Sequence, residues 1–334
     1  MKRVASLLSP IKIKRMLLKN RIVMPPMATE LATESGEVTD ALVAHYDSRC
    51  GSLGLMIVEH SYIRSGGKFS ERQLGIYSDE LVSGLSRIAE SAHKKDTPIA
   101  IQINHAGRRA TSKICGTQPV APSPIPDPES EESPRELTID EINILVRNFG
   151  LAARRAVKAG FDAVEIHGAH GFLLGQFCSP VINRRTDRYG GPLKNRMRLS
   201  IEVSSEVLKT AGKDVPIFYR LGAHDMTPGG LTLEEAKSIA KSLAKLGISV
   251  IDVSGGLCGS RPPNLSGEGY FTHLAQGIKQ VVKVPVITTG GIRAPSFADE
   301  IVRRGIADLV GVGRPLLGNP EWATKAVEAL KERL

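Results

Sequence analysis

The chain has 334 residues, of which 41% are hydrophobic and 24% charged, a composition typical of a globular protein. Its net charge of +9 leaves nucleic-acid binding, an acidic substrate or mere solubility open, but only 4% of residues are aromatic, which disfavours base-stacking surfaces. The four cysteines are far apart, which argues against a zinc site, an iron–sulfur cluster or a disulfide framework. The basic N-terminus lacks the long apolar core of a signal peptide, and no apolar run is long enough for a membrane span. We therefore expect a cytoplasmic protein without a membrane or nucleic-acid partner.

Eight short, apolar segments recur along the chain and predict strands that are buried on both faces. They are RIVMPPMA (21–28), LGLMIVEHSYI (53–63), PIAIQINHAG (98–107), DAVEIHGAHG (162–171), VPIFYRLGA (215–223), VIDVSGG (250–256), VPVITTGG (284–291) and ADLVGVGRP (307–315).

Segments with helical spacing separate these predicted strands. Thr138 with Glu141, and Thr232 with Glu235, predict capping boxes, and Ser78 is expected to begin another helix in the same way. Alternation of strand and helix eight times predicts an α/β fold, a single-domain (β/α)8 TIM barrel over residues 1–334. A doubly wound sheet is the alternative, but no predicted strand is followed by G-x-G-x-x-G.

Two segments lie outside this alternation. Residues 1–20 are expected to close the bottom of the barrel. Residues 108–137 contain six prolines and the acidic run ESEE, so they predict a long excursion after the third strand. This excursion is expected on the substrate side, at the C-terminal mouth where barrel enzymes place their active sites.

Polar residues follow several of the predicted strands and are expected to meet at that mouth. Gly290 and Gly291 end the seventh strand, and Gly313 and Arg314 end the eighth. Loops after these two strands commonly bind phosphate, because glycines let backbone N–H groups approach the anion. A simple tight turn is the alternative for the glycine pair.

The stretch HGAHGFLLGQFCSPVINRRTDRYGG (167–191), together with RIVMPPM, AIQINHAGR, VAPS, FYRL and the GG…GVGR pair, resembles the old yellow enzyme family of FMN-dependent oxidoreductases. The similarity is greatest to the bacterial branch that includes the barrel domains of trimethylamine dehydrogenase and 2,4-dienoyl-CoA reductase. It extends from about residue 10 to residue 320.

The resemblance implies an FMN cofactor across the mouth, with Gln102 on the pyrimidine side and Arg220 near N1 and O2. An ion pair with an acid such as Glu165 is the alternative role for Arg220. The residues expected to contact FMN are Pro25, Pro26, Met27, Ala28, His60, Gln102, Arg220, Gly290, Gly291, Gly313 and Arg314.

The resemblance further implies that His167 and His170 are catalytic and hydrogen-bond an electron-withdrawing group of the substrate, which stabilises the charge formed on hydride transfer. Two histidines make only half a zinc site, and no metal is expected. Phe172, Glu30, Tyr62 and Tyr270 are expected in the substrate pocket.

Three residues depart from the family pattern. Phe172 stands where the family usually has a proton-donating tyrosine, and Ala28 stands where many members have a Thr or Cys that bonds flavin O4. The proton then comes from solvent, from Tyr62, Tyr270, His60 or Glu30, or is not needed. Glu30 likewise replaces a tyrosine of one branch.

The resemblance implies an NAD(P)H:flavin oxidoreductase that reduces an activated C=C bond of a small molecule. No separate nicotinamide-binding fold is present, so NADH or NADPH is expected to act transiently and by a ping-pong mechanism. The chain ends before the cysteine-rich region of larger relatives, so neither an iron–sulfur cluster nor FAD is expected.

The alternatives are demethylation or dehalogenation by the same flavin chemistry, flavin binding without turnover, and a tRNA dihydrouridine synthase-like enzyme. The family also implies a homo-oligomer. The C-terminal helix that begins at Trp322 is a candidate interface, although packing on the barrel is the preferred interpretation.

Overall fold

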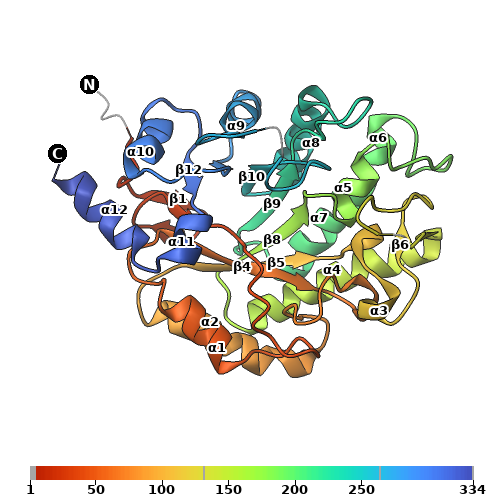
Figure 1. Cartoon of the computed structure of the whole chain (residues 1–334), viewed down its shortest axis with the longest axis horizontal. Helices are drawn as coiled ribbons and strands as arrows, with labels where there is room; N and C mark the ends of the chain where they lie inside the picture. Colours follow the sequence, from red (N-terminus) through yellow and green to blue (C-terminus); the bar gives the residue numbers. More distant parts are fainter. Residues whose placement is uncertain (1–4, 131, 263–264, 333–334) are drawn as a thin grey trace.

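Eight parallel strands close into a barrel in a computed structural model that describes residues 5–130, 132–262 and 265–332 (Figure 1). Their order around the barrel is β10-β11-β12-β3-β4-β5-β8-β9. The strands are β3 (Ile22–Met24), β4 (Leu55–Tyr62), β5 (Ile99–Asn104), β8 (Ala163–Gly168), β9 (Ile217–Gly222), β10 (Val250–Ser254), β11 (Val286–Thr288) and β12 (Leu309–Gly311). Each lies within one of the predicted strands, and the predicted (β/α)8 fold is confirmed.

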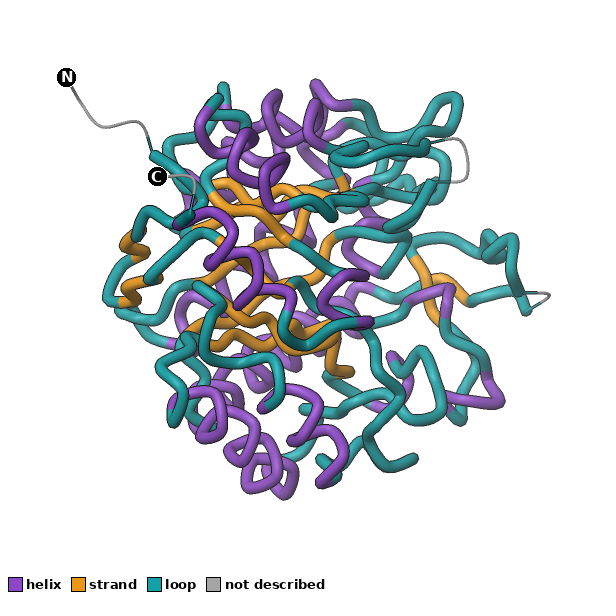
Figure 2. Tube along the Cα trace, turned by 60° about the vertical axis from the view of Figure 1, so that its left-hand side comes forward, coloured by secondary structure: helices purple, strands orange, loops and turns teal. Residues whose placement is uncertain are grey.

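Helices surround this barrel: in Figure 2 the barrel strands lie near the centre, with helices on the outside. The longer ones are α1 (Asp40–Asp47), α2 (Val82–His93), α4 (Ile139–Lys158), α7 (Arg198–Ala211), α8 (Leu233–Leu246), α9 (Thr272–Lys279), α10 (Pro295–Arg303) and α12 (Trp322–Lys331). The shorter ones are α3 (Ser112–Cys115), α5 (Leu173–Cys178), α6 (Leu193–Arg196) and α11 (Arg314–Gly318), with 3-10 turns η1 (Ser65–Gly67), η2 (Asp79–Leu81) and η3 (Gly107–Arg109). Helix α12 packs against α10 and α11. None of the helices in the described ranges is long and apolar enough to cross a membrane.

Helix capping follows the sequence at two of the three predicted places. Thr138 and Thr232 each form a complete capping box at the start of α4 and α8. The prediction at Ser78 was wrong, because its side chain makes no cap bond and the chain first forms the turn η2. Asp79 is instead bonded by Arg155 Nε of helix α4 at 2.6 Å, which fixes this turn against a neighbouring helix.

The bottom of the barrel is covered by the antiparallel hairpin of β1 (Ile11–Ile13) and β2 (Met16–Leu18). Ile13, Met16 and Leu18 are buried in one apolar cluster with inward-facing residues of all eight barrel strands. Those residues are Val23, Leu55, Ile57, Ala100, Ala163, Phe218, Val250, Ile287 and Leu309. Residues 1–4 of the predicted closing segment lie outside the described residues.

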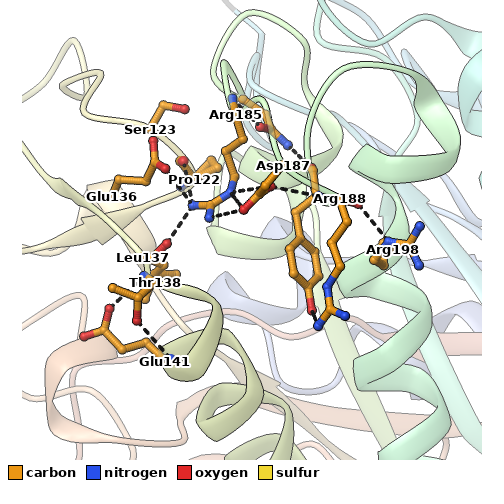
Figure 3. Close-up of polar contacts among 12 residues, drawn as sticks. Pro122, Ser123, Glu136, Leu137, Thr138, Glu141, Arg185, Asp187, Arg188 and Arg198 are labelled. Atoms are coloured by element: carbon orange, nitrogen blue, oxygen red, sulfur yellow. Dashed lines mark hydrogen bonds and ion pairs between the residues drawn. The ribbon is translucent and has the colours of Figure 1, made fainter.

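The excursion between β5 and α4 contains η3, α3 and a small parallel ladder of β6 (Val120–Ala121) and β7 (Arg135–Glu136). Arg185, from the arginine-rich loop after α5, reaches into this segment (Figure 3). Its Nη1 donates to Leu137 O at 2.7 Å and Pro122 O at 3.2 Å, while Asp187 pairs with its Nη2 at 2.6 Å. One buried guanidinium therefore fastens the middle and the C-terminal end of the excursion at the mouth of the barrel.

Candidate active site

A cavity of about 460 Å³ opens at the carboxyl ends of the strands. Its volume is within the range of small-molecule sites. The predicted residues that line it are Pro25, Pro26, Met27, Ala28, His60, Gln102, His167, His170, Phe172, Arg220, Tyr270, Gly290, Gly291, Gly313 and Arg314. The fold thus brings together side chains from strands that are far apart in sequence.

Tyr62 and Glu30 do not line the cavity, so their expected place in the substrate pocket was wrong. Tyr62 stacks on Tyr77 at a centroid distance of 5.0 Å and donates to Ser35 O. The pairing of β4 with β5 shifts register between Val58 and Ser61. His60 lines the cavity, whereas Tyr62, two residues further along β4, packs against Tyr77 outside it.

Glu30 lies at the surface in a left-handed conformation with φ +57°. Its carboxylate accepts hydrogen bonds from the Ser70 hydroxyl and from Arg72 N. It fastens one loop to another and does not face the cavity.

The two predicted catalytic imidazoles lie side by side at the end of β8. Their ring centroids are 5.0 Å apart and nearly perpendicular. Nδ1 of His167 accepts from Ala169 N at 3.3 Å, which places the remaining proton on Nε2, where it is available to a ligand. His170 has φ +55°, a costly conformation, and its Nε2 lies 2.6 Å from Ser254 Oγ. The bond to this hydroxyl fixes the second ring.

Both imidazoles are neutral at ordinary pH. Burial, followed by the charge of neighbouring His170 and Arg220, lowers the pKa of His167 well below its usual value. Burial and then Arg220 do the same to the pKa of His170. Burial lowers the pKa of His60 to about 4. The site therefore presents neutral hydrogen-bond donors close to a fixed cation.

Phe172 forms an aromatic wall beside these imidazoles and is only 5% exposed. Its ring centroid lies 4.9 Å from that of His167 and 5.3 Å from that of His60. Phe69 meets Phe172 edge-on at 5.3 Å. No pattern in the sequence indicated Phe69, which follows η1 and reaches the cavity through the loop after β4.

A buried polar cluster lies within the barrel next to the cavity. Gln102 Nε2 donates to Glu165 Oε2 at 2.7 Å, and Arg220 Nε lies 3.2 Å from Asp252 Oδ2. The alternative role for Arg220, a barrel-interior ion pair, is thus real, but its direct partner is Asp252 and not Glu165. Burial raises the pKa of Asp252 to about 6 and that of Glu165 well above its usual value. On the side away from the cavity, Gln102 is bonded to the carboxyl group of Glu165 and Arg220 lies next to that of Asp252.

The loops after β11 and β12 form a glycine cradle at the other end of the cavity. Gly290 and Gly291 have φ +111° and +72°, and a Cβ on Gly291 would meet Gly267 O at 2.6 Å. A Cβ on Gly313 would meet Met27 Sδ at 3.1 Å. Arg314 adds a cation at the same end. Backbone N–H groups that can approach an anion closely, together with a cation, suit a phosphate group.

The residues present fit FMN. The glycine cradle with Arg314 suits its phosphate, and the amide of Gln102 with the cation of Arg220 suits a polar heterocycle. Within residues 5–130, 132–262 and 265–332, no group of three or more His, Cys, Asp or Glu side chains is placed to hold a metal ion.

Several cavity residues were not predicted from the sequence. They are Phe69, Arg109, Gly259, Ser260, Arg261, Thr289, Ile292, Arg293, Gly311, Pro315 and Leu317. Three of them, Thr289, Gly311 and Pro315, lie inside predicted strand segments, and six others outside the excursion follow such a segment within five residues. Considering every residue at and just beyond each strand end would therefore have found these nine. Arg109 lies on the excursion, so its place in the cavity could be found only once the path of the excursion was known.

Comparison with known proteins places these features in a family context. The model of the NADH:flavin oxidoreductase / NADH oxidase family matches residues 6–333. An NADPH dehydrogenase of Clostridium acetobutylicum is 43% identical over 313 residues, which cover 92% of this chain and 90% of that protein. An NADH oxidase of Thermoanaerobacter brockii is 44% identical over 336 residues, 98% of this chain but 52% of its own length.

Solved structures show the same fold. The old yellow enzyme homologue from Zymomonas mobilis superposes with a TM-score of 0.87 at 31% identity, covering 97% of this chain and 93% of that chain. A 2-naphthoyl-CoA reductase in complex with 2-naphthoyl-CoA gives a TM-score of 0.91 at 27% identity, covering 97% of this chain and 52% of that one. The chain thus spans about half the length of some relatives that it matches and nearly the whole of others.

Proposed function

Because the chain belongs to the NADH:flavin oxidoreductase / NADH oxidase family, we propose that it takes hydride from NADH or NADPH and reduces an activated C=C bond. The observation that carries this proposal is the pair of neutral imidazoles, His167 and His170, in one cavity with a glycine cradle and a buried cation. Relatives named NADPH dehydrogenase and NADH oxidase support a nicotinamide as the reductant.

FMN would be held by Gly290, Gly291, Gly313 and Arg314 at its phosphate and by Gln102 and Arg220 at its ring. When bound, it supplies the two-electron chemistry that passes hydride from nicotinamide to substrate. Arg220, backed by Asp252, keeps a positive charge in a low-dielectric site, where it acts strongly on nearby negative charge.

His167 and His170 would bind the electron-withdrawing group of the alkene. A hydride that arrives at the β-carbon pushes negative charge onto that group, and fixed N–H donors stabilise this charge more than the ground state. Nε2 of His167 carries the proton for this bond, because its Nδ1 already accepts from Ala169 N. Neutral rings keep the donor available across the ordinary pH range.

Water is the proton source that the geometry favours. Tyr62 and Glu30 lie outside the cavity, and His60 is neutral with its Nδ1 occupied by Gln73 Nε2 at 2.8 Å. Tyr270 lies against the glycine cradle and donates to Ser260 O at 2.8 Å, and burial raises its pKa. None of these groups is a ready acid beside Phe172, so solvent that enters the cavity protonates the α-carbon.

One cavity would serve both reactants. Nicotinamide and alkene would each have to reach FMN through the same cavity, which the imidazole pair and the glycine cradle line together. Nicotinamide would therefore leave before the alkene enters.

Initial-rate kinetics test this proposal, with NADPH or NADH as one substrate and dimethyl fumarate as the other. Parallel double-reciprocal lines, with consumption of the alkene, are the expected result. Intersecting lines would contradict the shared pocket, and absence of alkene reduction by flavin-loaded protein would contradict the activity.

A further inference from the structure

The cavity is lined by several arginines but by no acidic side chain among the described residues. Its arginines are Arg109, Arg220, Arg261, Arg293 and Arg314. Two of these, Arg220 and Arg314, are accounted for by the proposed cofactor site. Arg261 and Arg293 lie on the loops after β10 and β11, with Arg293 directly beyond the glycine cradle.

Arg109 differs from the others because it stands on the imidazole side of the cavity. Its Nη1 donates to the backbone oxygen of His170 at 3.0 Å. Its guanidinium carbon lies 5.3 Å from the ring centroid of Phe172 and 5.1 Å from that of Phe69. The aromatic pair and the backbone therefore hold this cation beside the group that would bind the electrophile.

The charge of Arg109 is only partly neutralised. Asp127 Oδ2 lies 3.8 Å from its Nε and 3.5 Å from Nε of Arg108, so one carboxylate serves two guanidinium groups. Glu129 approaches Nη2 at 3.2 Å, but its side chain is 81% exposed and solvated, whereas that of Arg109 is 20% exposed. An exposed carboxylate of this kind holds its partner weakly. These two carboxylates therefore neutralise the charge of Arg109 only in part.

We propose that Arg109 forms an anion subsite that binds a carboxylate substituent of the alkene, so that the enzyme prefers anionic activated alkenes to neutral ones. This inference rests on the proposed function for its substrate and on the arginine geometry for its ligand. An acceptor group at His167 and His170 and a carboxylate at Arg109 would fix both ends of a short alkene. Planar guanidinium matches a carboxylate through two parallel N–H bonds.

The competing explanation is that Arg109 only fastens the excursion to the mouth. A structural role would weaken anionic and neutral ligands alike when Arg109 is replaced. A subsite role would weaken only the anionic ones. Arg188 offers a matched control, since its guanidinium carbon likewise lies 5.1 Å from an aromatic ring, that of Tyr189, yet it does not line the cavity.

The experiment compares wild type, R109Q, R109K and R188Q, all loaded with FMN. Binding of monomethyl succinate and dimethyl succinate, which are not reducible, is followed by the change in flavin absorbance. Reduction of monomethyl and dimethyl fumarate is then compared by kcat/KM. These probes differ by one negative charge at nearly equal size.

For R109Q we expect about a 10- to 100-fold loss of affinity for monomethyl succinate, little change for dimethyl succinate, and the same contrast in kcat/KM. R109K should recover part of the loss because it keeps a point charge, and R188Q should match wild type. The proposal is overturned if wild type binds both succinates equally, or if R109Q weakens both by the same factor. Selective binding without reduction of either fumarate would uphold the subsite and refute the proposed function instead.

Discussion

Replacement of Phe172 by tyrosine is expected to speed the step in which the alkene is reduced. The new hydroxyl would extend from a ring whose centroid is 4.9 Å from that of His167, at the wall of the cavity. General acid catalysis contributes about 10²–10⁴-fold. Because water already supplies the proton in our account, we expect the lower end, roughly 10²-fold, and most for weakly activated alkenes.

Stopped-flow absorbance separates the two half-reactions. F172Y should reoxidise the reduced flavin faster with a weakly activated enone such as cyclohexenone, while reduction by the nicotinamide stays within a few-fold of wild type. F69Y is the matched control, since Phe69 lines the same cavity and meets Phe172 edge-on. A folded, flavin-loaded F172Y with an unchanged reoxidation rate would refute the argument that a missing proton donor limits this step.

Three further predictions concern the donor, the cradle and a buried acid. His167→Asn should lower kcat/KM for dimethyl fumarate by about 10²–10³-fold in steady-state assays, since one donor to the developing charge is displaced; an unchanged value would argue against this role. Gly291→Ala should weaken FMN binding by about tenfold or more in a fluorescence titration, because φ is +72° and the new Cβ would meet Gly267 O at 2.6 Å; unchanged affinity would show that this loop does not hold the phosphate. Burial raises the pKa of Glu59 to about 7 from its usual 4.5, so the folded state binds this proton more tightly than the unfolded state. This stabilisation of the folded state is complete below about pH 4.5 and decreases by up to about 3 kcal/mol as the pH rises to about 7. In urea unfolding, Glu59→Gln should therefore gain stability relative to wild type between pH 5 and pH 8. A stability difference that is equal at both pH values would contradict the shift in pKa.

The barrel could be predicted because each strand is buried on both faces and therefore appears as a continuous apolar run. The capping boxes at Thr138 and Thr232 were equally local, since each cap depends on residues three positions apart. At Ser78 no cap bond forms, and the turn that follows is bonded instead to a distant helix through Arg155 and Asp79. The local sequence patterns therefore predicted the helix caps correctly only where the cap depended on residues close together in the sequence.

The candidate site shows the same division. Strand-end residues such as Gln102 and Arg220 meet in the cavity because parallel strands end at one edge. The prediction for Tyr62 was wrong because its ring packs on Tyr77, a tertiary contact that the strand pattern does not record. Arg109 was missed because its place depends on how the excursion folds back over the mouth.

The arginine-rich loop after α5 has a structural role that its composition alone does not indicate. Arg185 bonds two backbone carbonyls of the excursion and pairs with Asp187 (Figure 3). Its side chain is nearly completely buried, so its charge serves the fold and not the ligand. The segment that it holds carries Arg109, which links this motif to the proposed substrate subsite.

The visible absorbance spectrum of the flavin-loaded protein under anaerobic conditions tests the central claim most directly. Our account predicts that NADH or NADPH bleaches the flavin bands and that an activated alkene, dimethyl fumarate, restores them with one alkene reduced per flavin. A flavin that stays oxidised with both nicotinamides, or that is bleached but not reoxidised by the alkene, would contradict it.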